Sequence, residues 1–228
     1  MAQGVFITVE GIDGCGKTTQ ARLLELACAH AGLPVRRLRE PGGSEISEKI
    51  RALLLDPSHT AMGDTCELML YEAARAQLVH EVIRPALDAG ELVVCDRFYD
   101  STTAYQSFAD GLPLKTVLAA NALAVGQTHP DLTLYFRIDP EVARTRTIAR
   151  EQDRMEAKGF EFQRRVAEGF GEVARLYPDR VVTIDAAASA AEVFAAVARA
   201  VARAGVTFSA EDVSWALEHL ERDEGGRA

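Results

Sequence analysis

The chain has 228 residues, 48% of them hydrophobic, which suits a single globular domain with a full core. Its formal net charge of -9 argues against a nucleic-acid partner, because phosphate backbones attract clusters of lysine and arginine. No apolar stretch approaches the ~20 residues that span a bilayer, and no signal peptide is visible, so no membrane contact is expected. The four widely spaced cysteines indicate reduced thiols, which makes the cytoplasm the expected location.

Helical and extended patterns alternate along the chain. The β-branched run at 5–9 predicts a buried strand, and leucines at helical spacing predict a helix over 18–31 that ends at Gly32. Strands separated by helices imply right-handed crossovers and a parallel sheet covered on both faces, hence an α/β fold with five strands. The other predicted strands are 35–39, 92–95, 132–138 and 181–184, and the other predicted helices are 44–54, 65–89 (kinked at Pro85), 113–126, one ending near 177, and 190–204.

A glycine-rich loop joins the first strand to the first helix. The segment Gly11–Thr18 fits the pattern G-x-x-x-x-G-K-[ST] in the strand–loop–helix context that this motif requires. Its glycines let successive N–H groups point inward, and the helix dipole adds positive potential. Lys17 would reach the β- and γ-phosphates, and the Thr18 hydroxyl would bind Mg²⁺. We therefore expect a three-layer P-loop NTPase fold; the alternative is a glycine-rich turn with a solvated lysine.

Acidic and basic side chains follow the predicted central strand. Asp96 and Arg97 end that strand at the edge of the sheet where a ligand should bind. The carboxylate can hold the Mg²⁺ shell with Thr18, and the guanidinium can contact the transferred phosphate. As an alternative, Asp96 caps the next turn. No Asn-Lys-x-Asp motif occurs, so guanine-specific recognition has no support.

Several blocks of the chain form an ordered set of motifs. They are Glu10–Thr19, Arg39–Gly43, Tyr71 with Arg75–Gln77, Asp96–Phe98 with Ser101–Gln106, Pro130–Thr133 and Asp153–Glu156. Taken in this order, they resemble the bacterial thymidylate kinases (dTMP kinases) of the nucleoside monophosphate kinase group. The resemblance implies a Mg²⁺-dependent transfer of the ATP γ-phosphoryl group to dTMP, a kinase domain over 1–205, and a homodimer.

The resemblance also implies an acceptor site. Tyr71 would stack on thymine and Arg75 would bond the base edge, and their i,i+4 spacing puts both on one helix face. On spacing alone, the alternative is that Tyr71 belongs to the core. A cis Glu40-Pro41 bond is implied as well, aiming Arg39 at the acceptor phosphate. The full set of predicted dTMP-binding residues is Asp13, Arg39, Arg51, Tyr71, Arg75, Arg97, Thr102, Tyr105 and Gln106.

Donor and catalytic residues come from the same resemblance. Because no arginine lies in the middle of the P-loop, arginines of a charged lid at about 144–158 would reach the transferred phosphoryl group, unless this run is only a solvated face. Arg144 or Arg146 would stack on adenine. The predicted ATP-binding residues are Gly11, Ile12, Asp13, Gly14, Cys15, Gly16, Lys17, Thr18, Thr19 and Arg144. The predicted catalytic residues are Asp13, Lys17, Arg97, Arg150 and Arg154, and the metal ligands are Thr18 and Asp96.

A C-terminal extension, 206–228, lies beyond the resemblance. Ser209 and Asp212 form a capping signature for a helix over 209–220. Its apolar face should dock on the kinase body or on a second subunit, since so short a helix is marginal alone. The polar tail 221–228 is expected to be mobile.

Two other functions stay open from the residues alone. One is a P-loop kinase for another deoxynucleotide or nucleoside. The other, from a different class, is a nucleotide-dependent switch or assembly ATPase. Measuring which nucleotide accepts the phosphoryl group would distinguish the first alternative from a dTMP kinase. Measuring whether ADP forms without any acceptor would distinguish the second.

Overall fold

A five-stranded parallel sheet forms the centre of the computed structural model, which describes residues 4–147 and 153–225. The strands lie in the order β2-β3-β1-β4-β5, so the loop-bearing strand β1 is central. This confirms the α/β fold with five parallel strands. The strands are β1 (Val5–Glu10), β2 (Val35–Arg39), β3 (Leu92–Asp96), β4 (Leu132–Arg137) and β5 (Val181–Asp185).

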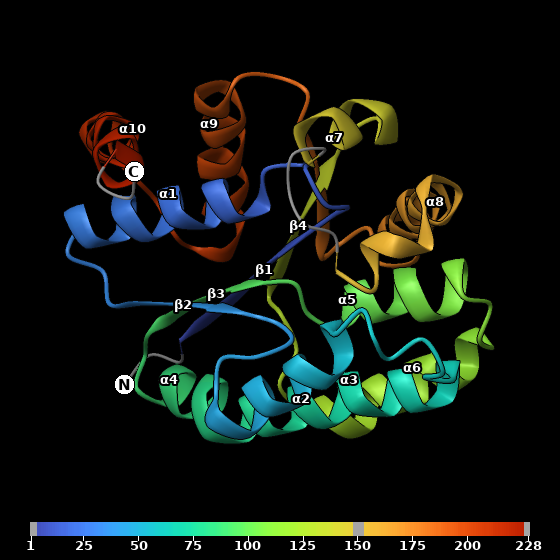
Figure 1. Ribbon diagram of the computed structural model, residues 1–228. Helices are drawn as coiled ribbons and strands as arrows, with labels where there is room; N and C mark the ends of the chain where they lie inside the picture. Colours follow the sequence, from blue (N-terminus) through green and yellow to red (C-terminus); the bar gives the residue numbers. More distant parts are fainter. Residues whose placement is uncertain (1–3, 148–152, 226–228) are drawn as a thin grey trace.

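Helices cover both faces of the sheet. They are α1 (Lys17–His30), α2 (Glu45–Leu55), α3 (Asp64–Leu78), α4 (Arg84–Asp88), α5 (Tyr99–Thr102), α6 (Leu114–Val125), α7 (Pro140–Thr147), α8 (Phe160–Leu176), α9 (Ala190–Val201) and α10 (Ala210–Gly225). Figure 1 shows α1, α9 and α10 on one side of the sheet and α3, α4 and α6 on the other. Within the described residues, we find no helix with the length and apolar character needed to cross a membrane.

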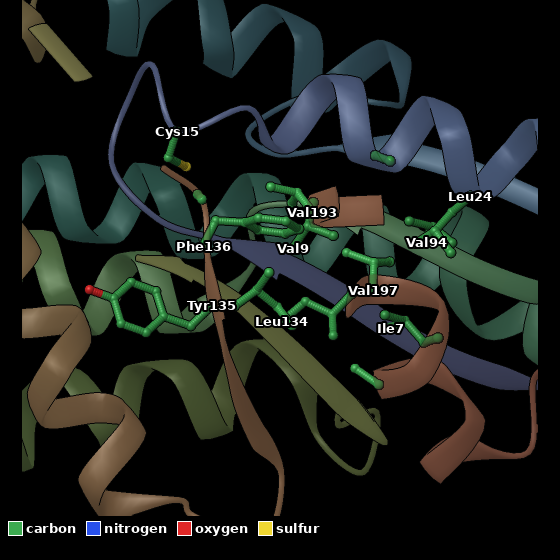
Figure 2. Close-up of a cluster of buried hydrophobic side chains, with 14 of the residues drawn as sticks. Ile7, Val9, Cys15, Leu24, Val94, Leu134, Tyr135, Phe136, Val193 and Val197 are labelled. Atoms are coloured by element: carbon green, nitrogen blue, oxygen red, sulfur yellow. The ribbon is translucent and has the colours of Figure 1, made fainter. Parts of the chain in front are cut away.

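The core lies on both faces of the central strands. Figure 2 shows Ile7 and Val9 of β1 among side chains of β3, β4, α1 and α9. Phe6, which points the other way, packs with residues of α3, α4 and α6. Parallel strands buried on both faces are nearly all apolar, which is why this fold could be recognised from the sequence.

The segment predicted as one helix over 65–89 is divided. It is α-helical to Leu78, then makes a π-helical turn at Val79–Ile83 before α4. The Arg84 N–H donates to the Val79 carbonyl, five residues earlier. Pro85 has no N–H with which to continue the α-helical pattern, so the irregularity lies one turn before the proline rather than at it.

Two helical segments were not predicted from the sequence. The first is 99–109, which forms α5 and a π-helical stretch, Thr103–Ala109. The second is α7, inside which the predicted lid begins. Threonine, serine and aromatic residues are mediocre helix formers, so the first segment carries no clear helical signal. The packing of α8 against it supplies the stabilisation that local propensity does not.

The C-terminal extension packs on α1 of the main domain. The Asp212 N–H donates to Ser209 Oγ (3.1 Å) and the Ser209 N–H to Asp212 Oδ2 (2.7 Å), which confirms the predicted cap. Ala216 is fully buried, and Trp215 stacks on His30 of α1 with ring centroids 5.0 Å apart. The helix runs to Gly225, five residues beyond its predicted end at 220; residues 226–228 lie outside the described part.

Removal of this helix should destabilise the protein without changing its chemistry. Truncation after Ala204 exposes the apolar side chains of α1 that α10 covers. Each kcal/mol of unfolding free energy lost should lower the melting temperature by about 2–4 °C. Truncation after Leu220 keeps the docked face and serves as the control. Thermal unfolding and dTMP turnover at low temperature are the measurements. An unchanged melting temperature, or loss of dTMP binding in a folded protein, would contradict this assignment.

Candidate active site at the carboxyl edge of the sheet

The P-loop follows β1 and leads directly into α1. Gly14 and Gly16 have φ of 82° and 91°, which other residues rarely adopt. A Cβ at Gly11 would lie 2.7 Å from the Phe136 carbonyl, so glycine is also needed where the loop passes β4. No side chain caps the start of α1. Its first N–H groups are therefore directed at the loop, as in helix-terminus phosphate sites.

Lys17 lies folded over this loop. Its side chain is only 7% exposed, and Nζ donates to the Ile12 carbonyl (2.9 Å) and to Cys15 Sγ (3.7 Å). The ammonium is thus held against the backbone of the loop. A bound phosphate would exchange these modest contacts for a charge-assisted one.

The two predicted metal ligands lie side by side. Thr18 Oγ1 donates to Asp96 Oδ2 at 2.7 Å, so a hydroxyl and a carboxylate meet at the mouth of the loop. Hard oxygen ligands of this kind suit Mg²⁺, which takes one or two protein side chains and completes its shell with phosphate and water. Among the described residues no cluster of three or more His, Cys, Asp or Glu could hold a metal. The donor set therefore fits Mg²⁺ bound together with a nucleotide.

Arg97 bridges the loop and the next helix. It adopts φ of 69°, a left-handed conformation uncommon outside glycine. Nη1 donates to the Gly11 carbonyl (2.9 Å), and Nη2 pairs with Asp13 Oδ1 (2.7 Å). The guanidinium also lies 5.3 Å from the centre of the Tyr105 ring. These contacts bring together four of the predicted site residues, Gly11, Asp13, Arg97 and Tyr105.

Glu10 has a structural role that the sequence did not reveal. It is fully buried and accepts hydrogen bonds from the Phe98 N–H (2.8 Å) and from Ser101 Oγ (2.5 Å). Burial, assisted by the charge of Asp100, raises the pKa of Glu10 to about 8. Glu10 therefore anchors the turn that carries Arg97. The signal was an acidic residue at the end of an otherwise apolar strand, next to the loop.

Arg75 is held between two buried carboxyl groups. Nε donates to Glu40 Oε2 (2.8 Å) and Nη1 to Glu72 Oε1 (2.7 Å), and the side chain is 2% exposed. One guanidinium cannot neutralise the charge of two carboxylates that are both buried away from solvent. Burial accordingly raises the pKa of Glu40 to about 7, with Arg75 lowering and Glu72 raising it. Phe98 lies under the guanidinium, 5.3 Å from its carbon.

The turn after β2 gathers the other two arginines. The Glu40-Pro41 bond is cis, as the resemblance implied. Nη1 of Arg39 and Nη1 of Arg51 both donate to the Pro41 carbonyl, at 3.1 and 2.7 Å. Burial and the nearby Arg39 charge lower the pKa of Arg51. Arg51 is therefore part of the cluster rather than a solvated helical arginine.

One cavity of about 670 Å³ joins these groups. It runs from the P-loop to Arg75, and all nine predicted acceptor residues line it. Lining residues from the donor side are Gly14, Gly16, Lys17, Thr18, Thr19 and Asp96. Cys15 is instead buried in the core (Figure 2), Ile12 is buried and lines a smaller neighbouring cavity, and Gly11 lies against β4.

The structure distributes the lid arginines differently from the prediction. Arg154 is buried and pairs with Glu67, with Nη1 and Oε2 2.6 Å apart, outside the cavity. Arg144 lies over the Phe160 ring and lines a smaller neighbouring cavity of about 190 Å³. Arg146 lines the large cavity, and Nη1 donates to the Gly14 carbonyl (3.4 Å). Arg150 lies outside the described residues.

Comparison with known proteins agrees with this geometry. A family model described as thymidylate kinase matches residues 9–197. The thymidylate kinase of Halalkalibacterium halodurans is 45% identical over 202 residues, 87% of this chain and 96% of the relative; that of Bacillus velezensis is 44% identical over 186 residues, 80% and 88%. The crystal structure of thymidylate kinase from Ehrlichia chaffeensis has a TM-score of 0.70 at 33% identity and covers 86% of this chain and 98% of that one. This chain therefore belongs to the thymidylate kinase family.

Proposed function

We propose that the protein is a phosphotransferase that moves the γ-phosphoryl group of ATP to dTMP and gives dTDP and ADP. The observation that carries this conclusion is the single cavity between Lys17 of the P-loop and the buried Arg75, in a chain of the thymidylate kinase family. Neither a kinase for another nucleotide nor a switch ATPase is favoured by a specific feature of the site.

At the donor end, the loop N–H groups and Lys17 bind the β- and γ-phosphates of ATP. Thr18 and Asp96 would hold Mg²⁺, which neutralises phosphate charge when bound. Arg144 is our proposed contact for adenine; Arg146, which lines the large cavity, is the other candidate.

At the acceptor end, Arg39, Arg51 and Arg97 hold the monophosphate near the donor. No general base is needed, because the attacking phosphate oxygen is already anionic. Positioning and electrostatic stabilisation therefore account for the rate. Asp13 orients Arg97 in this arrangement, and Thr102 lines the acceptor cavity near it.

The lid completes the site in this proposal. Arg150 and Arg154 would contact the transferred phosphoryl group, and Arg154 must first leave Glu67 and the Leu54 carbonyl, to which its Nε donates at 2.7 Å. Lys158 also contacts Glu67, with Nζ and Oε1 3.3 Å apart, so it can keep that carboxylate paired when Arg154 leaves.

Assembly and location follow the family expectation. We propose a homodimer, which the exposed apolar side chains of Met69 on α3 and Leu123 on α6 support, since these two helices are neighbours. We also propose a kinase domain over 1–205, an extension over 206–228 whose helix α10 packs on α1, and a cytoplasmic location.

Measurement of ADP formation tests the function. Mg²⁺-ATP is supplied with a panel of nucleoside monophosphates, and dTMP should give by far the highest kcat/KM. Equal turnover of another monophosphate would favour the kinase alternative. ADP formation at the same rate without an acceptor would favour the ATPase alternative.

We propose that Tyr105 packs beneath the deoxyribose of the acceptor, where its ring should exclude a ribose 2′-hydroxyl. Its ring is fixed edge-on by Phe162 and Phe170 and its hydroxyl lies 3.5 Å from Asp13 Oδ2, so it cannot retreat easily. We expect a much higher kcat/KM for dTMP than for its ribo analogue. Tyr105→Ala should lower the ratio of the two values roughly tenfold, because it removes the steric rejection of the 2′-hydroxyl. Tyr105→Phe keeps the ring and should keep the preference. If the wild-type protein uses both nucleotides equally, this placement is wrong.

A further inference from the structure

Glu67, near the start of α3, touches no substrate in the mechanism proposed above, yet it makes hydrogen bonds or ion pairs with Gln106, Arg154 and Lys158. Its side chain is 1% exposed. Oε1 accepts a hydrogen bond from Gln106 Nε2 (2.8 Å), and Oε2 pairs with Arg154 Nη1 (2.6 Å). Lys158 Nζ lies 3.3 Å from Oε1 and is shared with Asp110, at 2.8 Å. Glu67 thus links the lid to a residue that lines the acceptor cavity.

The surroundings of Glu67 favour its ionised form. Burial opposes ionisation, but the charges of Lys158 and Arg154 hold the pKa of Glu67 below its ordinary value. An ionised carboxylate has four acceptor positions and no hydrogen to donate. Every group that touches Glu67 must therefore present a donor.

This requirement decides the orientation of the Gln106 amide. The two ends of a glutamine amide differ only in that one donates and the other accepts, and their assignment follows from the partners. Because Glu67 can only accept, the NH₂ end faces it. The oxygen Oε1 is then directed elsewhere, on a side chain that lines the same cavity as Tyr71 and Arg75.

An acceptor at this position distinguishes the pyrimidines. Thymine carries a hydrogen on N3 and can donate it to Oε1, whereas neutral cytosine has a lone pair on N3 that would face another lone pair. A reversed amide would favour cytosine for the same reason. Sites built around one such hydrogen bond reject the mismatched ligand strongly, because a buried polar atom is left without a partner.

We propose that Glu67 is a positioning residue that fixes the Gln106 amide with its oxygen toward the base and thereby sets the preference for a pyrimidine protonated on N3. Lys158 and Arg154 support it from the lid, so the lid segment and base selection share one carboxylate. The inference rests on the proposed function, because it takes a pyrimidine monophosphate as the acceptor.

The test compares kcat/KM for dTMP and dCMP. Glu67→Gln is nearly isosteric and lets the Gln106 amide turn either way, so the ratio of the two values should fall about tenfold or more. The KM for ATP should not change. Asp110→Asn also removes a negative charge next to Lys158, but Asp110 has no contact with Gln106, so this variant should keep the ratio. An unchanged ratio in a folded Glu67→Gln protein overturns the proposal.

A double-mutant cycle separates positioning from a purely structural effect. If Glu67 acts through Gln106, Glu67→Gln should have little further effect on the ratio in a Gln106→Ala background, whereas independent effects would add. Additive effects would overturn the proposal. Failure of the wild-type protein to phosphorylate dTMP would instead contradict the proposed function, so the two failures are distinguishable.

An exchange variant covers the case in which Glu67→Gln does not fold. Glu67→Gln combined with Gln106→Glu keeps the charge, the volume and one donor–acceptor pair between the two positions. The amide at 67 would donate to the carboxylate at 106, which again presents an acceptor to the base. This variant should retain the preference for dTMP. A folded exchange variant that prefers dCMP, or has no preference, would overturn the proposal.

Discussion

Lys17→Ala should lower kcat by about 10²–10³-fold while the protein stays folded. The ammonium neutralises charge that shifts between the β- and γ-phosphates as the phosphoryl group moves, and no other described lysine lines the cavity. The KM for dTMP should change little, since the acceptor lies at the other end. Steady-state kinetics with a coupled ADP assay, together with a thermal unfolding curve, measures both parts.

Lys115→Ala is the matched control for Lys17. Lys115 lies exposed in the first turn of α6, away from the cavity, and its loss should leave kcat unchanged. Near-normal turnover in Lys17→Ala would remove the P-loop lysine from the mechanism.

Arg75→Met should cost about 3–5 kcal/mol of unfolding free energy at pH 8. Methionine fills much of the volume but leaves Glu40 and Glu72 buried without a cation. The loss should be smaller at pH 5. The pKa of Glu40 is already about 7 in the folded protein, against 4.5 in the unfolded chain, and removal of Arg75 raises it further. The stability that this group contributes is present below pH 4.5 and is lost as the pH rises through the folded value.

Chemical denaturation at pH 5 and pH 8 measures this effect. Arg164→Met is the control, because Arg164 on α8 is more than half exposed and its pairs with Glu161 and Glu168 are long, at 3.5 and 4.0 Å. It should change stability by less than about 0.5 kcal/mol at either pH. Equal losses at both pH values in Arg75→Met would show that packing, not charge, is what Arg75 supplies.

Local patterns accounted for much of the fold. The strands that carry the P-loop and Asp96 are short apolar runs, and the loop has a fixed spacing, so their positions follow from neighbouring residues alone. The resemblance supplied the acceptor residues, which do line one cavity. The π-helical turn before Pro85 and the helix over 99–109 did not follow, because their backbone is set by contacts with other elements.

The partners of the buried charged residues could not be predicted from the sequence, for a different reason. Arg154 was expected at the phosphates but lies on Glu67, 87 residues earlier, and Glu10 reaches Ser101 across the sheet edge. Such pairs depend on the relative placement of whole elements. A charge pattern within one segment cannot specify them.

The two carboxyl groups with raised pKa values also affect the energetics of folding in neutral buffer. Near pH 6, Glu10 (pKa about 8) and Glu40 (about 7) are mostly protonated in the folded protein, while the unfolded chain with its value of 4.5 is ionised. Folding therefore takes up protons from the solution, and the buffer releases them. The heat absorbed on unfolding will then include the ionisation heat of the buffer. A calorimetric comparison of phosphate with an amine buffer at the same pH measures the net number of protons released on unfolding, to which Glu10 and Glu40 should contribute.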